Sequence, residues 1–205
     1  MLAPLLIIVY NRIDHLKKAI ESVKSNIEAK ETILYVSSDG WKNEEDKIKV
    51  KKIREYSRSI TGFKSVEIIS YDKNLGGDAT NKSREYIFSK YDRLITIEDD
   101  NLVSPLFLSY VNKGLRFYEN DPRIFSICGY SPFILGDNYP EENSLFKHHE
   151  WNAWGFGMWK DKYLNSLNHR ESKDYFIDLN KNLRDKFFIK KLNQITLEYY
   201  PHLLF

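Results

Sequence analysis

Residues 94–101 read Leu-Ile-Thr-Ile-Glu-Asp-Asp-Asn, an apolar run that ends in three acidic side chains, Glu98, Asp99 and Asp100. The run is typical of a buried strand. Carboxylates are too costly to bury unpaired, so the triplet requires a cation, hydroxyl donors or solvent. In open α/β sheets, ligands bind beyond the carboxyl ends of the strands. Carboxylates in that position suit a divalent ion that prefers oxygen ligands and also carries substrate phosphates.

Further apolar runs resemble strands, and helical patterns lie between them. Because the runs are continuously apolar, they indicate strands covered on both faces, as in a largely parallel sheet. The expected strands are residues 5–9, 33–36, 66–70, 94–97 and 124–128. Alternation of strands and helices at this spacing predicts an α/β doubly wound fold, a Rossmann-like, mostly parallel sheet flanked by helices.

Each of the first four strands is followed by an expected helix. Asn11 or Asp14 would cap the first helix, and Ser104 would cap the fourth, with Pro105 in its first turn. The second helix, about residues 44–56, is highly charged and is expected to face solvent. The residues expected to face inward are Ile13, Leu16, Ile20 and Val23 in the first, Ala79, Tyr86 and Ile87 in the third, and Phe107, Val111, Gly114 and Tyr118 in the fourth.

The pattern changes after residue 128. We expect residues 1–128 to form the α/β region, and residues 129–205 to form an aromatic-rich loop followed by a helical tail. Two glycines lie among the three tryptophans of residues 151–159. Such a segment either packs in the core or, as we favour for a loop, forms a platform on which a sugar ring stacks.

Length and composition narrow the possible functions. The chain has 205 residues and a net charge of +2, so no global positive field points to nucleic acid. Its single cysteine, Cys128, excludes an intrachain disulfide and is expected in the core. No run reaches the ~18–20 apolar residues of a membrane span, and residues 1–9 look like a first strand rather than a secretion signal. We expect a cytoplasmic protein, with peripheral contact at the inner face of the membrane left open.

Polar clusters follow the first four expected strands, at the edge where an α/β site is assembled. They are residues 10–12, 37–40, 72–77 and 98–100. Arg12 and Asp39 can bracket a polar ring or sugar hydroxyls, but a surface arginine and a local turn at Asp39-Gly40 are equally consistent with the pattern. Gly76-Gly77 allows close approach of a ligand or simply a tight turn. Ligation of Mn²⁺ or Mg²⁺ by Asp100 through a substrate diphosphate explains the acidic triplet best, because helix capping accounts for only one carboxylate.

In combination these residues resemble the nucleotide-sugar glycosyltransferases of the GT-A fold. The similarity covers about residues 3–165 and is greatest to the family-2-like bacterial enzymes and to the N-acetylglucosaminyltransferase I type. The matching segments are Leu6–Arg12, Ser38-Asp39-Gly40, Glu98-Asp99-Asp100, Ser104–Phe107, Asp121-Pro122 and Trp154–Trp159. The resemblance implies an inverting transfer of a sugar to a hydroxyl of a glycan or lipid-linked acceptor, with a UDP-sugar as the expected donor. It specifies no oligomeric state.

Residue roles follow from the same resemblance. Arg12 and Asp39 would contact the nucleotide, and Glu98 and Asp99 would lie near the ribose and donor sugar. Asp100 would be the metal ligand. The segment that begins Trp154-Gly155 would line the donor-sugar and acceptor side.

The chain departs from the family where the catalytic base is expected. Inverting relatives carry an acidic motif with tryptophan after the Trp/Gly segment, whereas no tryptophan follows Trp159 here. Asp161, Asp174 and Glu150 are the remaining candidates, with Asp161 the one we select. The apolar ending Leu203-Leu204-Phe205 suggests a truncated chain. Two alternatives therefore stay open: a truncated or degenerate module that binds nucleotide sugar without efficient turnover, and a sugar-nucleotidyltransferase.

Overall fold

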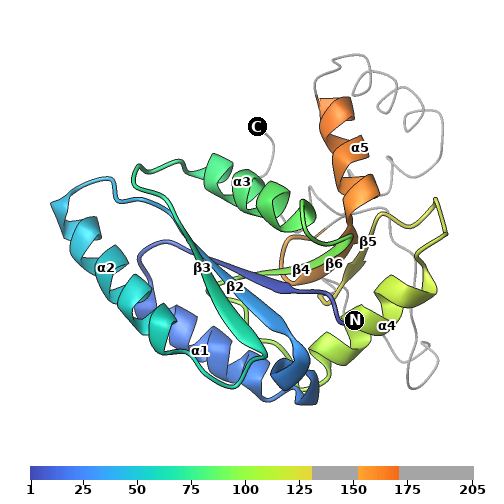
Figure 1. Ribbon diagram of the computed structural model, residues 1–205, viewed down its shortest axis with the longest axis horizontal. Coiled ribbons are helices and arrows are strands. Elements are labelled where there is room, and N and C mark those ends of the chain that lie inside the picture. Colours follow the sequence, from blue (N-terminus) through green and yellow to red (C-terminus); the bar gives the residue numbers. More distant parts are fainter. Residues whose placement is uncertain (131–151, 171–205) are drawn as a thin grey trace, which may run out of the picture. The chain divides into compact units, whose positions relative to one another are not determined.

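The sequence folds around a single mixed sheet, shown in Figure 1 as a computed structural model that describes residues 1–130 and 152–170. Within these residues the strand order is β3-β2-β1-β4-β6-β5. The first four strands in the order are mutually parallel, and β6 runs antiparallel to both of its neighbours. The strands are β1 (Leu5–Val9), β2 (Ile33–Ser38), β3 (Ser65–Ser70), β4 (Arg93–Glu98), β5 (Ser126–Cys128) and β6 (Phe156–Trp159). The predicted α/β class with a mostly parallel, Rossmann-like sheet is confirmed.

Helices cover both faces of this sheet. Figure 1 shows α1, α2 and α4 on one face and α3 on the other. The helices are α1 (Ile13–Lys24), a short 3-10 helix η1 (Ile27–Glu31), α2 (Glu44–Ser59), α3 (Gly77–Phe88), α4 (Phe107–Phe117) and α5 (Lys160–Arg170). Strand β1 lies inside the sheet between β2 and β4, with helices over both faces, and its residues Leu5, Leu6 and Ile7 are fully buried. Continuous burial on both faces is the reason for the unbroken apolar runs of the sequence.

The chain divides into two compact units, Met1–Lys162 and Tyr163–Phe205. All six strands belong to the first unit. The functional division predicted after residue 128 stays a prediction, and the helical tail predicted from about residue 174 lies outside the described residues. In the part of the chain that the structure describes, no helix has both the length and the apolar character needed to span a bilayer.

The predicted helix caps are wrong at two places. The N-cap residue of α1 is Arg12, which makes no capping bond through its side chain, and Asn11 instead donates to Asp46 of α2 at 2.7 Å. Helix α4 begins at Phe107 rather than after Ser104. There the Ser104 carbonyl accepts a bond from the Phe107 N–H at 3.1 Å, so Ser104 closes a turn that precedes the helix.

Two predictions of burial also change. Tyr86 of α3 was expected to face inward but is 44% exposed, whereas Ala79 and Ile87 are buried. Helix α2 was expected to face solvent, yet it buries Val50 and Ile53 completely. A few apolar side chains at helical spacing are enough to seat a charged helix on a sheet.

The glycine-tryptophan segment is not a loop throughout. Residues Phe156–Trp159 form β6, an interior strand that pairs with β4 and β5. Trp159 is buried, and its indole N–H donates to the Leu115 carbonyl of α4 at 3.1 Å. Trp159 is therefore a core residue, and the stacking platform predicted for this segment is wrong at this position. Strand β6 was missed because glycine and the lack of β-branched residues in Phe-Gly-Met-Trp give a weak strand signal.

Gly157 offers a test of the packing between β6 and α4. A Cβ at this residue would meet Val111 Cγ1 at 2.5 Å and Leu115 Cδ1 at 2.9 Å. We expect Gly157→Ala to lower the free energy of unfolding in urea by about 1–3 kcal/mol, the usual cost of overpacking a core. Gly77→Ala is the matched control, because no atom lies within 4 Å of its added Cβ, and it should be neutral or stabilising. Equal stability of the two variants would contradict this packing.

Candidate functional site

The candidate site lies where the direction of strand succession reverses. Strand β1 lies between β2 and β4. The chain adds β2 and β3 on one side of β1 and then crosses to add β4 on the other side. Such a switch point opens a crevice at the carboxyl ends of the two diverging strands. Arg12 follows β1, and Glu98 ends β4, with Asp99 and Asp100 directly after it. The sheet therefore brings together two of the polar clusters predicted from the sequence.

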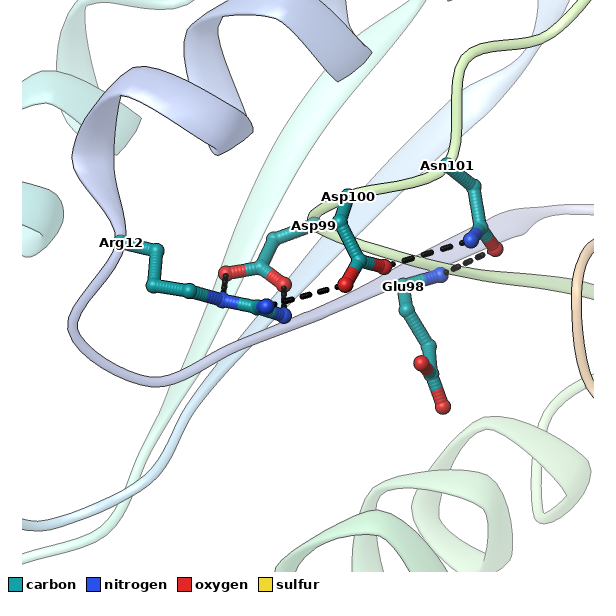
Figure 2. A network of polar contacts seen from close by, with 5 residues as sticks. All are labelled: Arg12, Glu98, Asp99, Asp100 and Asn101. Carbon is teal, nitrogen blue, oxygen red and sulfur yellow. Dashed lines mark hydrogen bonds and ion pairs between the residues drawn. The ribbon is translucent and has the colours of Figure 1, made fainter.

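Arg12 connects the two sides of this crevice (Figure 2). Its guanidinium donates through Nε to Asp99 Oδ2 at 3.2 Å and through Nη2 to Asp99 Oδ1, a forked pair. Nη1 also lies 2.9 Å from Asp100 Oδ2. The Asp99 side chain is only 3% exposed, whereas those of Arg12 and Asp100 are 46% and 37% exposed. The arginine thus compensates a buried carboxylate from the solvent side.

The pKa directions agree with this geometry. Burial raises the pKa of the Asp99 carboxyl, and the hydrogen bonds from Arg12 oppose that effect without cancelling it. The hydrogen bond to Asp99 raises the pKa of the Arg12 guanidinium, which stays charged. The pKa of Glu98 is raised chiefly by burial and then by the nearby charges of Asp100 and Asp99.

Asn101 orders the turn that carries the acidic triplet. Its Oδ1 accepts from the Glu98 N–H at 3.0 Å, and its Nδ2 donates to Asp100 Oδ1 at 3.3 Å. Figure 2 shows the Glu98 side chain pointing away from Arg12, whereas Asp99 and Asp100 point toward it. The three carboxylates therefore lie in two different environments: Asp99 and Asp100 contact Arg12, whereas Glu98 does not.

Asp39, at the end of β2, is held by the loop that follows β3. Its Oδ1 accepts from the backbone N–H groups of Gly40 and Leu75 at 2.8 and 2.9 Å. Its Oδ2 accepts from the Gly76 N–H at 2.8 Å and from Asn74 Nδ2 at 3.0 Å. The local turn at Asp39-Gly40 is therefore present, but the side chain reaches well beyond it.

Arg54 of α2 joins the ends of β2 and β3 through hydrogen bonds. This role was not predicted from the sequence. It donates through Nη2 to the Tyr71 carbonyl at 2.6 Å, and through Nε to Ser38 Oγ at 3.2 Å. Desolvation lowers the pKa of its guanidinium, although nearby carboxylates oppose this. Arg54 lies within a run of charged helix residues, so its sequence context gives no sign that it is structural.

Arg12, Asp39 and the first two residues of the acidic triplet line one pocket with a volume of about 240 Å³. Four of its lining residues, Arg12, Asp39, Glu98 and Asp99, were predicted as site residues. The sequence predicted none of the other lining residues as site residues, although four of them lie in the polar clusters that follow the strands: Tyr10, Ser37, Asn74 and Gly76. The remaining lining residues are Ile8, Val9, Tyr10, Ser37, Lys42, Asn74, Gly76, Ala79 and Thr80.

Asp100 lines a second pocket, with a volume of about 460 Å³. Trp154, which is 53% exposed, lies in its wall beside Tyr130, and the two rings meet edge to face with centroids 4.9 Å apart. Val103 and Phe107 supply apolar surface. Of the aromatic segment predicted as a platform, Trp154 alone among the described residues lines this pocket.

Two predicted site residues lie elsewhere. Gly155 has φ +80° and turns the chain into β6, where its carbonyl accepts from the Gly129 N–H at 2.7 Å. Asp161 is in the first turn of α5, two residues after Trp159. Trp159 pairs with Arg93, the first residue of β4. The triplet follows the other end of β4, roughly 17 Å away at about 3.3 Å per residue. Asp161 is therefore wrong as the base for chemistry at Asp100, while Glu150 and Asp174 lie outside the described residues.

The donor set fits a divalent ion only if the substrate shares in its coordination. In residues 1–130 and 152–170, no group of three or more His, Cys, Asp or Glu side chains is placed to hold a metal. Mg²⁺ and Mn²⁺ often take only one or two protein carboxylates and complete their shell with phosphates and water. Asp100 is exposed enough to supply one such ligand.

Comparison with known proteins shows likeness at the level of the fold. No protein-family model matches the sequence, and no curated protein does. Among solved structures, S. aureus TarS 1-349 in complex with UDP-GlcNAc is 14% identical, with a TM-score of 0.46 over 69% of this chain and 37% of that one. The mannosyltransferase PcManGT from Pyrobaculum calidifontis, in complex with GDP-Man and Mn²⁺, is 11% identical, with a TM-score of 0.43 over 62% and 34%.

A cytidylyltransferase from Leptospira borgpetersenii is 11% identical, with a TM-score of 0.48 over 82% of this chain and 64% of that one. The chain thus spans less than two thirds of each of these three proteins. At such identities and TM-scores, the likeness carries no conclusion about substrate, which must come from the site itself.

The ion pair between Arg12 and Asp99 can be tested through stability. We expect Arg12→Gln to lower the free energy of unfolding by about 1–3 kcal/mol near neutral pH, because a buried carboxylate loses its charged donors. Without Arg12 the already raised pKa of Asp99 rises further. The loss should therefore shrink as the pH falls through that raised value and Asp99 becomes neutral. Urea denaturation from about pH 5 to about pH 8 measures both effects.

Arg123→Gln is the matched control. Arg123 also pairs with an aspartate, Asp121, but its side chain is 75% exposed. Its removal should cost no more than about 1 kcal/mol. A loss for Arg12→Gln that equals that of the control, or that does not diminish in acid, would show that Arg12 does not compensate a buried charge.

Proposed function

We propose that this chain binds a nucleoside-diphosphate sugar, with UDP as the nucleotide, and transfers the sugar to an acceptor hydroxyl with inversion, as in GT-A glycosyltransferases. One observation carries the proposal. The ends of β1, β2 and β4 surround a single pocket at the switch point of the sheet, and Arg12 spans it to reach the acidic triplet. This is the position where open α/β sheets bind nucleotides.

The charges of the pocket suit a diphosphate. Asp99 is already compensated by Arg12, and Lys42 adds a second cation to the lining. Arg12 Nη1 contacts only the half-exposed Asp100, so it can turn to phosphate oxygens, for which a guanidinium is well shaped. Asp100 would hold Mn²⁺ or Mg²⁺. When bound, that ion would supply Lewis-acid stabilisation of the departing nucleoside diphosphate.

We place the acceptor in the second pocket. Glu98 and Asp99 line the first pocket and Asp100 lines the second, so the acidic triplet lies between the two. The exposed ring of Trp154 and that of Tyr130 can stack on the apolar face of a sugar. Leu102 and Leu106 nearby are 68% and 72% exposed. A glycan or a lipid-linked saccharide fits this combination of aromatic and aliphatic surface.

The position of Asp161 favours one alternative, a module that binds nucleotide sugar without efficient turnover. Inverting transfer needs a base that deprotonates the acceptor hydroxyl. Asp161 lies at the opposite edge of the sheet from Asp100, so it cannot take that role. Hydrolysis and transfer assays with UDP-sugars and Mn²⁺ decide between the two functions. UDP-sugar that binds without release of UDP would support the module.

Asp100→Ala tests the proposed binding. Isothermal titration should show UDP binding that strengthens with Mn²⁺ in the unaltered protein. The variant should lose at least about tenfold in affinity with Mn²⁺, equivalent to about 1.4 kcal/mol, and should keep its thermal midpoint. Asp14→Ala, an exposed aspartate in the first turn of α1, lines neither pocket and should bind as the unaltered protein does. Unchanged affinity of Asp100→Ala would remove Asp100 as the metal ligand.

A further inference from the structure

The Asp39 carboxylate has no acceptor position left for a ligand. An ionised carboxylate accepts about four hydrogen bonds, two on each oxygen. Gly40 and Leu75 donate to Oδ1, and Gly76 and the Asn74 amide donate to Oδ2, all at 2.8–3.0 Å. A nucleobase N–H could bind this carboxylate only by displacing one of these donors. Asp39 therefore lines the pocket with its acceptor positions already taken by protein donors.

Two glycines hold this arrangement in place. Gly76 has φ +58°, a conformation that side chains disfavour, and it lets the Gly76 N–H reach Asp39. A Cβ on Gly40 would lie 2.3 Å from the backbone carbonyl carbon of Lys73. The loop after β3 thus sits directly on the end of β2. Little movement is available that would free Asp39.

Asn74 presents the opposite case, because one of its polar atoms remains available. Its Nδ2 donates to Asp39 Oδ2 at 3.0 Å and to the Gly40 carbonyl at 2.8 Å, which uses both amide hydrogens. The reverse orientation would set Oδ1 against two acceptor oxygens, so the hydrogen-bond network fixes the amide as described. Asn74 lines the first pocket, and its Oδ1 has no protein donor among the contacts of the described residues.

We propose that Asn74 Oδ1, and not the Asp39 carboxylate, accepts the ring N–H of the nucleobase, with Asp39 acting as a positioning residue that orients Asn74. This rests on the proposed function. The donor sugar must reach Asp100 past the acidic end of the pocket, so the base occupies the other end, between β2 and α3. There Ala79 and Thr80 join Asn74 in the wall. An amide oxygen matches the N3–H of uracil, whereas cytosine and adenine place a lone pair at the equivalent ring nitrogen.

Methylation of the base at N3 tests the assignment directly. We expect the unaltered protein to bind UDP at least about tenfold more tightly than N3-methyl-UDP, because methylation removes the hydrogen and leaves Oδ1 unpaired. In Asn74→Ala the two ligands should bind equally within about twofold. Asp39→Ala should also reduce the preference, and the Asp39→Ala, Asn74→Ala double variant should reduce it no further than Asn74→Ala alone. Isothermal titration of each protein with both ligands measures these ratios.

The comparison is made within each variant, so a general loss of affinity does not obscure it. Lys73→Ala is the control, since Lys73 is an exposed neighbour in the same loop and does not line the pocket. It should keep the full preference. An Asn74→Ala variant that still prefers UDP would overturn the assignment, as would unaltered protein that binds both ligands equally well. Failure of the unaltered protein to bind UDP at all would overturn the proposed function as well.

Discussion

The pairing of Arg12 with Asp99 is the interaction on which the site depends. Asp99 is buried at the end of β4, where an unpaired carboxylate would be costly, and the only charge that pairs with it among the described residues comes from the end of β1. These two strands lie side by side at the switch point of the sheet. The ion pair therefore joins the two sides of the crevice and holds Arg12 beside Asp100, and both of its residues line the pocket.

Most of the sheet could be predicted because its inner strands β1, β2 and β4 are buried on both faces. For β1, β2 and β4 the ranges predicted from the apolar runs all fall within the observed strands. Only the exact first and last residues of these strands were not determined by the sequence. β6 could not be found in this way, since Phe-Gly-Met-Trp owes its place to pairing with two neighbours and to a glycine that admits Val111 and Leu115. Such a strand is specified by tertiary packing rather than by local pattern.

The position of the site was predictable for a related reason. Polar residues that follow parallel strands must gather at one edge, so Arg12, Asp39 and the acidic triplet could be grouped before any geometry was known. Their individual states could not be predicted, because these depend on partners distant in sequence. Asp39 is satisfied by residues 74–76, and the two strand ends behind it are joined by Arg54 from α2. Asp161 was misassigned because its position follows from the direction of β6, which the sequence did not reveal.

Three aspartates at the same edge of the sheet thus differ in what they can still bind. Asp39 accepts four protein N–H bonds, and Asp99 is held by both arms of a guanidinium in a buried position. Asp100 is more exposed and pairs only with Nη1 of Arg12. It also accepts a long hydrogen bond of 3.3 Å from Asn101 Nδ2. Because a ligand binds most readily where the least protein bonding must be given up, Asp100 is the aspartate that we propose as the metal ligand. The other two aspartates line the pocket in which we propose that the nucleotide lies.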